Sequence, residues 1–409
     1  MKMKKGVFKL LATFFLSALL LPFYLHAKSL EEAIKDIKIS GEIKGGYYHQ
    51  KIDPDPLKDF QDSSSSNLVE YRGILRMATP VINGLQMVME GLFQDRNGHI
   101  ENIPGSDRLF SVYQLYGTYI LSNSKTNIIL GRQYMDTPFT NELISTGFKV
   151  TNKDLPGWVF SIVAFKNMKD RNDELYYYIS DLKASKDKHI KDKKFYGIGA
   201  EGSFGVIPMK IWVGNIDEVT SNIFAEAKYG INYQGFDIGV TGQYCASSID
   251  DRVKELSDMD DSTYYGVCAK VGNTVFNARA GYTYIETENN KKGFVAFQNV
   301  GSFISAGEMM KYKKGLSVDL NYGETKTWFI ATRINILPIK GLTLRADYVN
   351  VENSIVSKDR DAEEFVIGGK YRFNKKLNFK TWYSIFKDDS KNTPKIDQST
   401  FHFEAKYKF

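Results

Sequence analysis

The chain has few residues of the types that build metal centres or membrane-spanning helices. Its 409 residues include only 2 Cys and 5 His, and no two histidines have metal-ligand spacing. After residue 27, no apolar run reaches the roughly 20 residues that a transmembrane helix needs. The glycines around Gly199 do not precede a predicted helix, so a phosphate-binding loop is not indicated. These absences argue against a metalloenzyme, a nucleotide-binding enzyme and a helical membrane protein.

A strong excess of basic charge is also lacking once the N-terminus is set aside. The formal net charge is +6, from 54 Lys and Arg against 48 Asp and Glu. Four of the lysines lie within residues 1–9, so the rest of the chain carries about +2. Nucleic-acid binding therefore has no electrostatic support, and we expect no nucleic-acid partner.

Residues 1–27 have the three parts of a secretory signal peptide. Basic residues come first, an apolar stretch spans residues 10–21, and Leu25-His26-Ala27 is an acceptable cleavage site. The alternative is an uncleaved membrane anchor, for which the apolar stretch is short. We expect export, removal of residues 1–27, and a single mature domain over residues 28–409. An exported chain without transmembrane helices is either soluble or a β-barrel.

Aromatic residues and glycine are plentiful, and apolar and polar residues alternate. Tyr (25), Phe (27) and Gly (33) suit a barrel whose rings lie at the membrane interfaces. Over residues 399–409, Phe401, Phe403 and Phe409 share one face of a strand, and Glu404 and Lys406 share the other. A similar strand begins near residue 37. Pairing of the first and last strands would close the sheet and remove both of its edges.

Interior stretches repeat this alternation, with charged residues opposite the apolar face. A charge that faces hydrocarbon costs roughly 2–4 kcal/mol at mid-bilayer, so the charged side chains should point inward. Arg132 is ambiguous, because Ile128 and Leu130 share its face. The basic residues predicted to line the lumen are Arg72, Arg76, Arg132, Arg279, Arg333, Arg345, Lys370 and Arg372.

The alternation predicts an all-β fold, a transmembrane antiparallel β-barrel of about eighteen strands, with sixteen as the alternative. The weakest strand covers residues 175–182, and without it the alternation of long and short connections would break. Bacterial barrels have short periplasmic turns and longer outer loops. A barrel this wide cannot be filled by its own side chains, so it should hold an aqueous channel. The predicted strands begin near residues 37, 67, 84, 110, 126, 158, 175, 194, 209, 222, 236, 262, 274, 327, 342, 363, 376 and 399.

The third outer connection, over residues 134–157, is predicted to fold inward and narrow the channel. Its acidic residues are Asp136, Glu142 and Asp154. Opposite the basic wall they would create a transverse field that sorts solutes by charge. The alternative is that the loop lies outside the barrel and its charges are merely solvated.

Cys245 and Cys268 lie nearly symmetrically about the connection centred near residue 256. Both fall on the polar face of their strands, so they could form a cross-strand disulfide in an oxidising compartment. The alternative is two free thiols that are out of register by a residue or two.

Three stretches carry a family resemblance: SLEEAIKDIKISG at 29–41, GRQ and DTPFT within 131–140, and GFKVTN at 147–152. They resemble the major outer membrane protein porins of campylobacters and their relatives, which are related to the OprD-like channels. The resemblance implies an eighteen-stranded homotrimer in the outer membrane of a Gram-negative bacterium, in contact with its lipids. It also implies Ca²⁺ associated with the pore and a mild cation preference, but no metal ligands map onto this sequence.

The functions that remain differ in how the lumen is used. The first is a porin for passive diffusion of ions and small hydrophilic solutes, with no enzyme activity and no certain cofactor. A substrate-specific channel would instead need an aromatic or basic track, for which Tyr113, Tyr116 and Tyr134 are candidates. The third is an outer-membrane adhesin or enzyme, for which His402 with Glu404 is a weak catalytic pair.

Overall fold

Long strands make up most of the structure. The computed structural model describes residues 36–54, 64–98, 110–140, 143–169, 193–293, 295–297, 301–310, 316–317, 320–355, 358–390 and 396–409. The barrel strands are β1 (Lys38–Pro54), β2 (Ser64–Ala78), β3 (Leu85–Gly98), β4 (Ser111–Ile120), β5 (Thr126–Tyr134), β6 (Ile144–Asn152), β7 (Trp158–Lys169), β8 (Lys194–Phe204), β9 (Ile207–Ile216), β10 (Thr220–Tyr233), β11 (Phe236–Ile249), β12 (Ser262–Gly272), β13 (Phe276–Thr287), β17 (Glu324–Asn335), β18 (Leu342–Ile355), β19 (Lys358–Arg372), β20 (Leu377–Ser390) and β21 (Ile396–Lys408).

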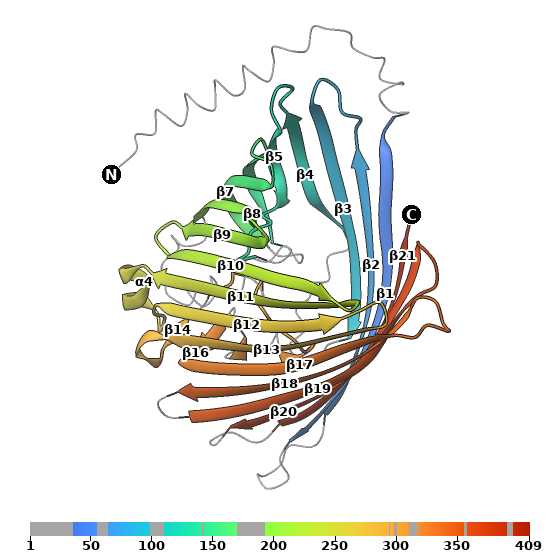
Figure 1. Ribbon diagram of the computed structural model, residues 1–409, viewed down its shortest axis with the longest axis vertical. Helices are drawn as coiled ribbons and strands as arrows, with labels where there is room; N and C mark the ends of the chain where they lie inside the picture. The colour runs from blue at the N-terminus through green and yellow to red at the C-terminus, as the bar shows by residue number, and fades with distance from the viewer. Residues whose placement is uncertain are drawn as a thin grey trace.

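Each barrel strand pairs antiparallel with the next, β13 pairs with β17, and β21 returns to pair with β1. The eighteen-stranded sheet is therefore closed, as Figure 1 shows. At the seam, the amides of Gly41 and Phe409 each donate to the other's carbonyl, at 3.2 and 3.1 Å. Closure leaves no unpaired edge, which is what a barrel needs in lipid. The predicted fold class, strand number and pairing of the terminal strands are confirmed.

One barrel strand lies where the sequence predicted a loop. β6 pairs with β5 on one side and β7 on the other, and β7 pairs directly with β8. Its outward face carries Thr146, Phe148 and Val150, so its alternation is too weak to recognise. The strand predicted at 175–182 lies outside the described residues. The predicted third outer connection is thus divided into a loop at 135–143 and a turn at 153–157 at the other end of the barrel.

The two faces of the wall differ in polarity as the alternation predicted. Ile43 and Tyr71 face outward and are 59% and 62% exposed, whereas their neighbours Lys44 and Arg72 face inward at 9% each. Lipid therefore meets apolar side chains, and the charged ones surround the lumen. The end with the short turns is the periplasmic end, because outer loops of such barrels are the longer connections.

Outside the barrel strands, short elements occupy two of the outer connections. The helix α4 (Asp251–Leu256) lies between β11 and β12. The short helix η3 (Glu288–Asn290) and the strands β14 (Lys292–Gly293), β15 (Leu316–Ser317) and β16 (Leu320–Tyr322) lie between β13 and β17. In the described part of the chain, no helix is long and apolar enough to cross a membrane.

An apolar core lies inside the outer half of the barrel. Phe195, Trp212, Phe224 and Tyr264 point inward near the outer ends of their strands and are almost fully buried. Apolar side chains at inward positions must be covered, because a water-filled lumen would leave them solvated. Phe139 covers them from the loop at 135–143, which folds inward as predicted. Residues 295–297 and 301–310 of the connection at 288–323 also fold inward, which the sequence did not indicate. Its residues in this core are Val295, Ala296, Phe297 and Phe303.

Candidate pore site

Two outer connections meet inside the barrel. The amide of Phe297 donates to the carbonyl of Phe139 at 2.6 Å, and that of Ser302 donates to the carbonyl of Pro138 at 2.9 Å. The rings of Phe139 and Phe297 lie 5.3 Å apart, and Phe195 packs against Phe297. Residues 135–140 of the first connection and residues 295–297 and 301–303 of the second therefore form one packed unit inside the outer half of the barrel.

Residues 301–310, which we call the lumen segment, continue from this unit along the inner wall. Gln243 of β11 donates to the carbonyl of Ser302 at 3.0 Å and accepts from the amide of Ile304 at 2.8 Å. Phe303 packs edge-on against Phe224 and Tyr264. Both backbone bonding and ring packing thus hold the first half of the lumen segment to β10–β12.

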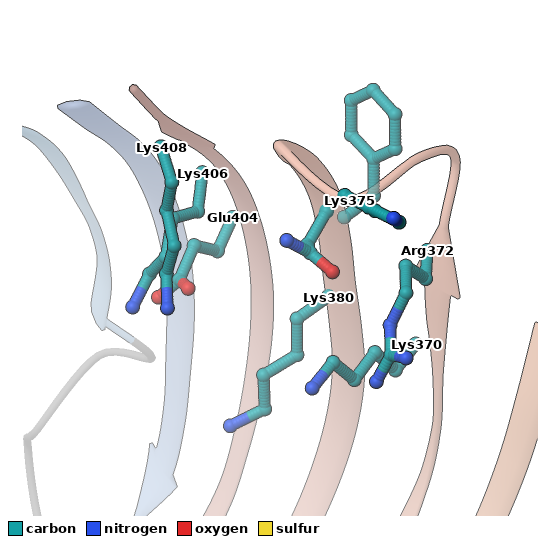
Figure 2. A pocket seen from close by; sticks show the side chains of 9 residues that line it. Lys370, Arg372, Lys375, Lys380, Glu404, Lys406 and Lys408 are labelled. Carbon is teal, nitrogen blue, oxygen red and sulfur yellow. The ribbon is translucent and has the colours of Figure 1, made fainter. Parts of the chain in front are cut away.

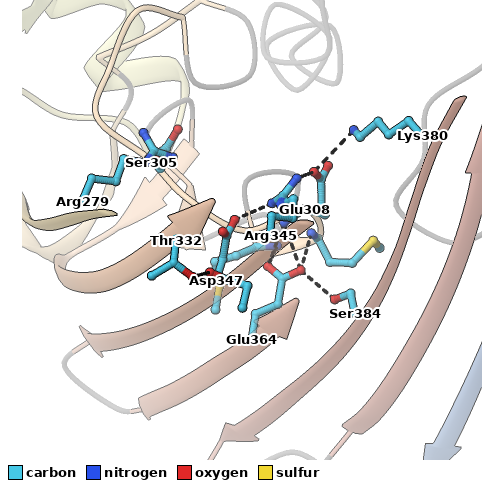
Figure 3. Close-up of polar contacts among 12 residues, drawn as sticks. Arg279, Ser305, Glu308, Thr332, Arg345, Asp347, Glu364, Lys380 and Ser384 are labelled. Atoms are coloured by element: carbon cyan, nitrogen blue, oxygen red, sulfur yellow. Dashed lines mark hydrogen bonds and ion pairs between the residues drawn. The ribbon is translucent and has the colours of Figure 1, made fainter. Parts of the chain in front are cut away.

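The second half of the lumen segment meets charged side chains of β13, β18 and β20, farther along the same wall (Figure 3). Glu308 forms ion pairs with Arg345 of β18 and, at 3.5 Å, with Lys380 of β20. Arg345 also pairs with Asp347. Arg279 of β13 donates to the carbonyl of Ser305 at 2.9 Å and lies over the ring of Phe329. Arg279 and Arg345 therefore act mainly as anchors for the lumen segment.

The other predicted basic residues of the lumen differ in how far they are neutralised. Arg72 of β2 donates to Glu42 at 3.1 Å, and Arg76 donates to the hydroxyl of Tyr116 at 3.2 Å. Arg333 faces inward beside Arg345 in the adjacent strand. Lys370 and Arg372 lie on the inward face of β19 and form no ion pair among the described residues, so they are available to solutes.

A recess of about 410 Å³ opens on the inner wall at the periplasmic ends of β19–β21. Six of its side chains are cations and only Glu404 is an acid, and Figure 2 shows the ammonium groups of Lys370 and Lys380 extending into the same space. We call this site the basic recess. Its lining residues are Lys370, Arg372, Lys375, Asn378, Phe379, Lys380, Glu404, Lys406 and Lys408.

The structure does not bring the three predicted acidic residues together. Asp136 lies in the inward loop and pairs with Lys149 at 2.9 Å, with two thirds of its side chain exposed. Asp154 lies in the turn at 153–157, at the periplasmic end. Hydrogen bonds from the Ser124 hydroxyl and the Lys125 amide hold the pKa of Asp154 below its usual range. Glu142 lies outside the described residues. Asp154 thus lies beyond the periplasmic end of β6, whereas Asp136 contacts the middle of that strand through Lys149.

Arg132 faces away from the lumen, which corrects its assignment as a pore-lining residue. It lies opposite Leu115, and its neighbour on the same face, Leu130, is 50% exposed on the outer wall. Its Nε donates to the carbonyl of Tyr113 at 3.0 Å. Arg132 is two residues from the outer end of β5, where a charged side chain is tolerated because the membrane interface is near.

Two of the acidic residues that organise the lumen, Glu308 and Glu364, were not among the predicted site residues. Glu364 is on the polar face of β19, so strand alternation could have identified it. Glu308 carries no such signal, because it belongs to a connection whose path depends on the rest of the barrel.

Cys245 and Cys268 are two free thiols, so the alternative without a disulfide is the one found. The register places Cys245 opposite Tyr264 and Cys268 opposite Thr241, four positions away from a facing pair. Ser247 of β11 pairs with Ser262 of β12, so the connection between these strands is centred slightly before residue 256, the centre that the sequence suggested.

We expect a water-soluble maleimide to modify Cys268 but not Cys245 in the folded protein. Cys245 is fully buried beneath the connection at 288–323, whereas Cys268 is partly exposed on the lumen face. Mass spectrometry of the peptides after labelling would measure this, with the urea-unfolded protein as the control in which both thiols react. Equal labelling of the two thiols in the folded barrel would contradict the packing described here.

Three carboxylates at the outer rim lie close enough together to suggest a cation site. Oxygens of Asp260, Asp261 and Glu288 lie within 4.8 Å of one another, and oxygen ligands suit Ca²⁺. The Lys254 ammonium, however, pairs with Asp260 at 2.9 Å and with Asp261 at 2.8 Å. Although burial raises the pKa of Asp260, hydrogen bonds from Asn289 and Lys254 hold it well below its usual range. With Lys291, which lies 3.4 Å from Asp260, two lysines thus offset two of the three negative charges, and the cluster is already paired within the protein.

The chain shares its fold with solved porins of pseudomonads. OccK8 (OprE) of Pseudomonas aeruginosa has a TM-score of 0.70 at 14% identity, covering 92% of this chain and 98% of that one. A BenF-like porin from Pseudomonas fluorescens Pf-5 has a TM-score of 0.70 at 14% identity, covering 91% and 99%. OpdK of Pseudomonas aeruginosa with vanillate has a TM-score of 0.69 at 15% identity, covering 92% and 99%.

None of the curated proteins compared with this chain matches it. A family model described as Campylobacter major outer membrane protein matches residues 3–409. With a closed eighteen-stranded barrel and a charged lumen, the chain belongs to this family of outer-membrane porins, as the resemblance predicted.

Proposed function

We propose that this porin mediates passive diffusion of ions and small hydrophilic solutes, and that its narrowest part lies beside the lumen segment. The observation that carries the proposal is the packing of two outer connections against the inner wall, with charged side chains along the remaining path. A lumen lined by ionised groups retains water, and solutes smaller than the constriction can cross without a binding step.

A second candidate is a channel that favours anionic solutes, and the basic recess supports it. Six cations against one acid raise the local concentration of anions at the periplasmic end. OccK2 of Pseudomonas aeruginosa was solved with glucuronate and OpdK with vanillate, both of which are carboxylates. The resemblance implied a mild cation preference, so the sign of the selectivity separates the two candidates.

Planar-bilayer recording of the refolded protein tests the proposed function. We expect stable, ohmic current steps that occur in groups of three, because the homotrimer implied by the resemblance would insert three channels together. Addition of a hydrophilic solute too large to pass should leave the conductance unchanged. A folded barrel that inserts but carries no current would overturn the porin proposal, and single steps alone would overturn the homotrimer.

We further propose that residues 1–27 are removed on export and that the protein has no catalytic role. The sequence offered His402 with Glu404 as a weak catalytic pair, but His402 is packed between two aromatic rings. His402 is buried with its ring centroid 4.2 Å from that of Tyr48 and 5.1 Å from that of Trp382. Such a histidine has no access to a substrate carbonyl at the rim of the barrel.

A further inference from the structure

One buried carboxylate of the barrel wall holds the far half of the lumen segment. Glu364 points inward from β19 and is 0% exposed. It accepts hydrogen bonds from three consecutive backbone amides, those of Glu308 at 3.0 Å, Met309 at 2.8 Å and Met310 at 2.9 Å. The hydroxyl of Ser384 on β20 donates a fourth bond at 2.6 Å. Figure 3 shows these bonds converging on the carboxylate.

No ion pair to Glu364 is found within the described residues, so its charge is compensated by oriented amide dipoles. Consecutive N–H groups that converge on one point form an anion-binding concavity. The compensation is mutual, because Met309 and Met310 are also buried and their amides would otherwise lack acceptors. Removing the Glu364 carboxylate would therefore leave three buried amides of the lumen segment without an acceptor and would remove the contact that joins the segment to β19.

The backbone around Gly307 is shaped for this contact. Gly307 has a φ of +83°, a conformation that L side chains rarely adopt. A Cβ at this position would lie 2.3 Å from Oε2 of Glu364. The next residue, Glu308, turns its own carboxylate away to Arg345 and Lys380. The backbone amide of Glu308 therefore faces Glu364, while its carboxylate points away from that residue. This arrangement avoids repulsion between the two acids.

We propose that Glu364 is a positioning residue that fixes the lumen segment against the inner wall and thereby sets the width of the water path. The inference rests on the constriction proposed above. Gln243 and the phenylalanine rings hold only the first half of the segment, whereas Glu364 and the ion pairs of Glu308 hold the second half. Without Glu364, three amides lose their shared acceptor, and only the ion pairs of Glu308 and the hydrogen bond from Arg279 still hold residues 305–310.

Glu364→Gln is the direct test, because glutamine keeps the shape of the side chain but presents an N–H group to amides that are themselves donors. We expect the stable conductance level of the wild type to be replaced by fluctuating levels that differ from it by roughly twofold, because conductance follows the open cross-section of a water-filled barrel and a loosened segment moves within that cross-section. The matched control is Glu363→Gln, one residue away on the outer face, where the acid bonds Tyr348 and Lys387. This control should keep the wild-type conductance.

Gly307→Ala tests the same contact from the segment side and changes no strand residue. Its Cβ should displace the segment from Glu364 and produce the same fluctuating conductance levels as Glu364→Gln. Assembly of each variant is checked by heat-modifiable migration on gels, and if Glu364→Gln does not fold, Gly307→Ala decides. Wild-type conductance in Gly307→Ala would overturn the inference, as would wild-type conductance in a folded Glu364→Gln. Silence of the wild-type protein would instead overturn the proposed function, so the two failures are distinguishable.

Discussion

Arginine in place of Val240 should destabilise the barrel severely, whereas arginine at the adjacent Thr241 should be tolerated. Val240 lies on the outer face of β11 and is 43% exposed to what would be hydrocarbon. An arginine there should lower the free energy of unfolding by roughly 2–4 kcal/mol, the cost found near the bilayer midplane. Urea titration of the protein refolded into lipid vesicles would measure this difference.

Thr241 serves as the matched control because it has the same strand, depth and substitution, and only the face differs. Its side chain points into the lumen, with Lys228 opposite on β10. Repulsion between two solvated cations is small, so Thr241→Arg should cost less than about 1 kcal/mol. Equal destabilisation by the two arginines would show that the wall is not divided into lipid and water faces as described.

Reversing three charges of the basic recess should reverse the ion preference of its end of the channel. In the variant Lys370→Glu, Arg372→Glu and Lys408→Glu, none of the lost cations forms an ion pair among the described residues, so the wall keeps its salt bridges. Loss of three positive charges and gain of three negative ones makes the local potential attract cations instead of anions. The chloride-to-potassium permeability ratio should fall several-fold.

The measurement is the reversal potential under a KCl gradient, made at low ionic strength, where charges lining the lumen are less screened. The control variant Lys370→Arg, Arg372→Lys and Lys408→Arg keeps every charge and should keep the wild-type ratio. If the charge-reversed variant has the wild-type reversal potential, the basic recess lies outside the path that limits ion flow. The second candidate function would then lose its support.

Most of the wall could be predicted from sequence because alternation along a strand is a local property. Phe401 and Phe403 can be assigned to the outer face because polar residues alternate with them. Each further strand can be assigned in the same way from its own sequence. β6 was missed because Thr146 weakens its apolar face and Gly147 has no side chain. Its omission was offset by the strand predicted at 175–182, so the expected number of eighteen matched the observed number although the boundaries did not.

The register of neighbouring strands was less accessible. The connection between β11 and β12 is centred slightly earlier in the chain than predicted. This small shift places Cys245 opposite Tyr264, four residues from Cys268. Likewise, Arg132 could be placed only when its partner Leu115 was known. Pairing depends on turn geometry as well as on the hydrophobic pattern, and the pattern alone leaves room for shifts that keep each face intact.

The sequence by itself determined a closed, exported barrel with a charged interior, because a period of two residues assigns each side chain to lipid or to water. Only the tertiary structure decided which connection enters the lumen and which charges remain free. Those outcomes rest on contacts such as Glu364 with the amides of residues 308–310 and Gln243 with Ser302, which join distant parts of the chain. No local sequence pattern predicts such contacts. Each partner is an ordinary residue in its own segment, and the two partners meet only when the barrel has formed.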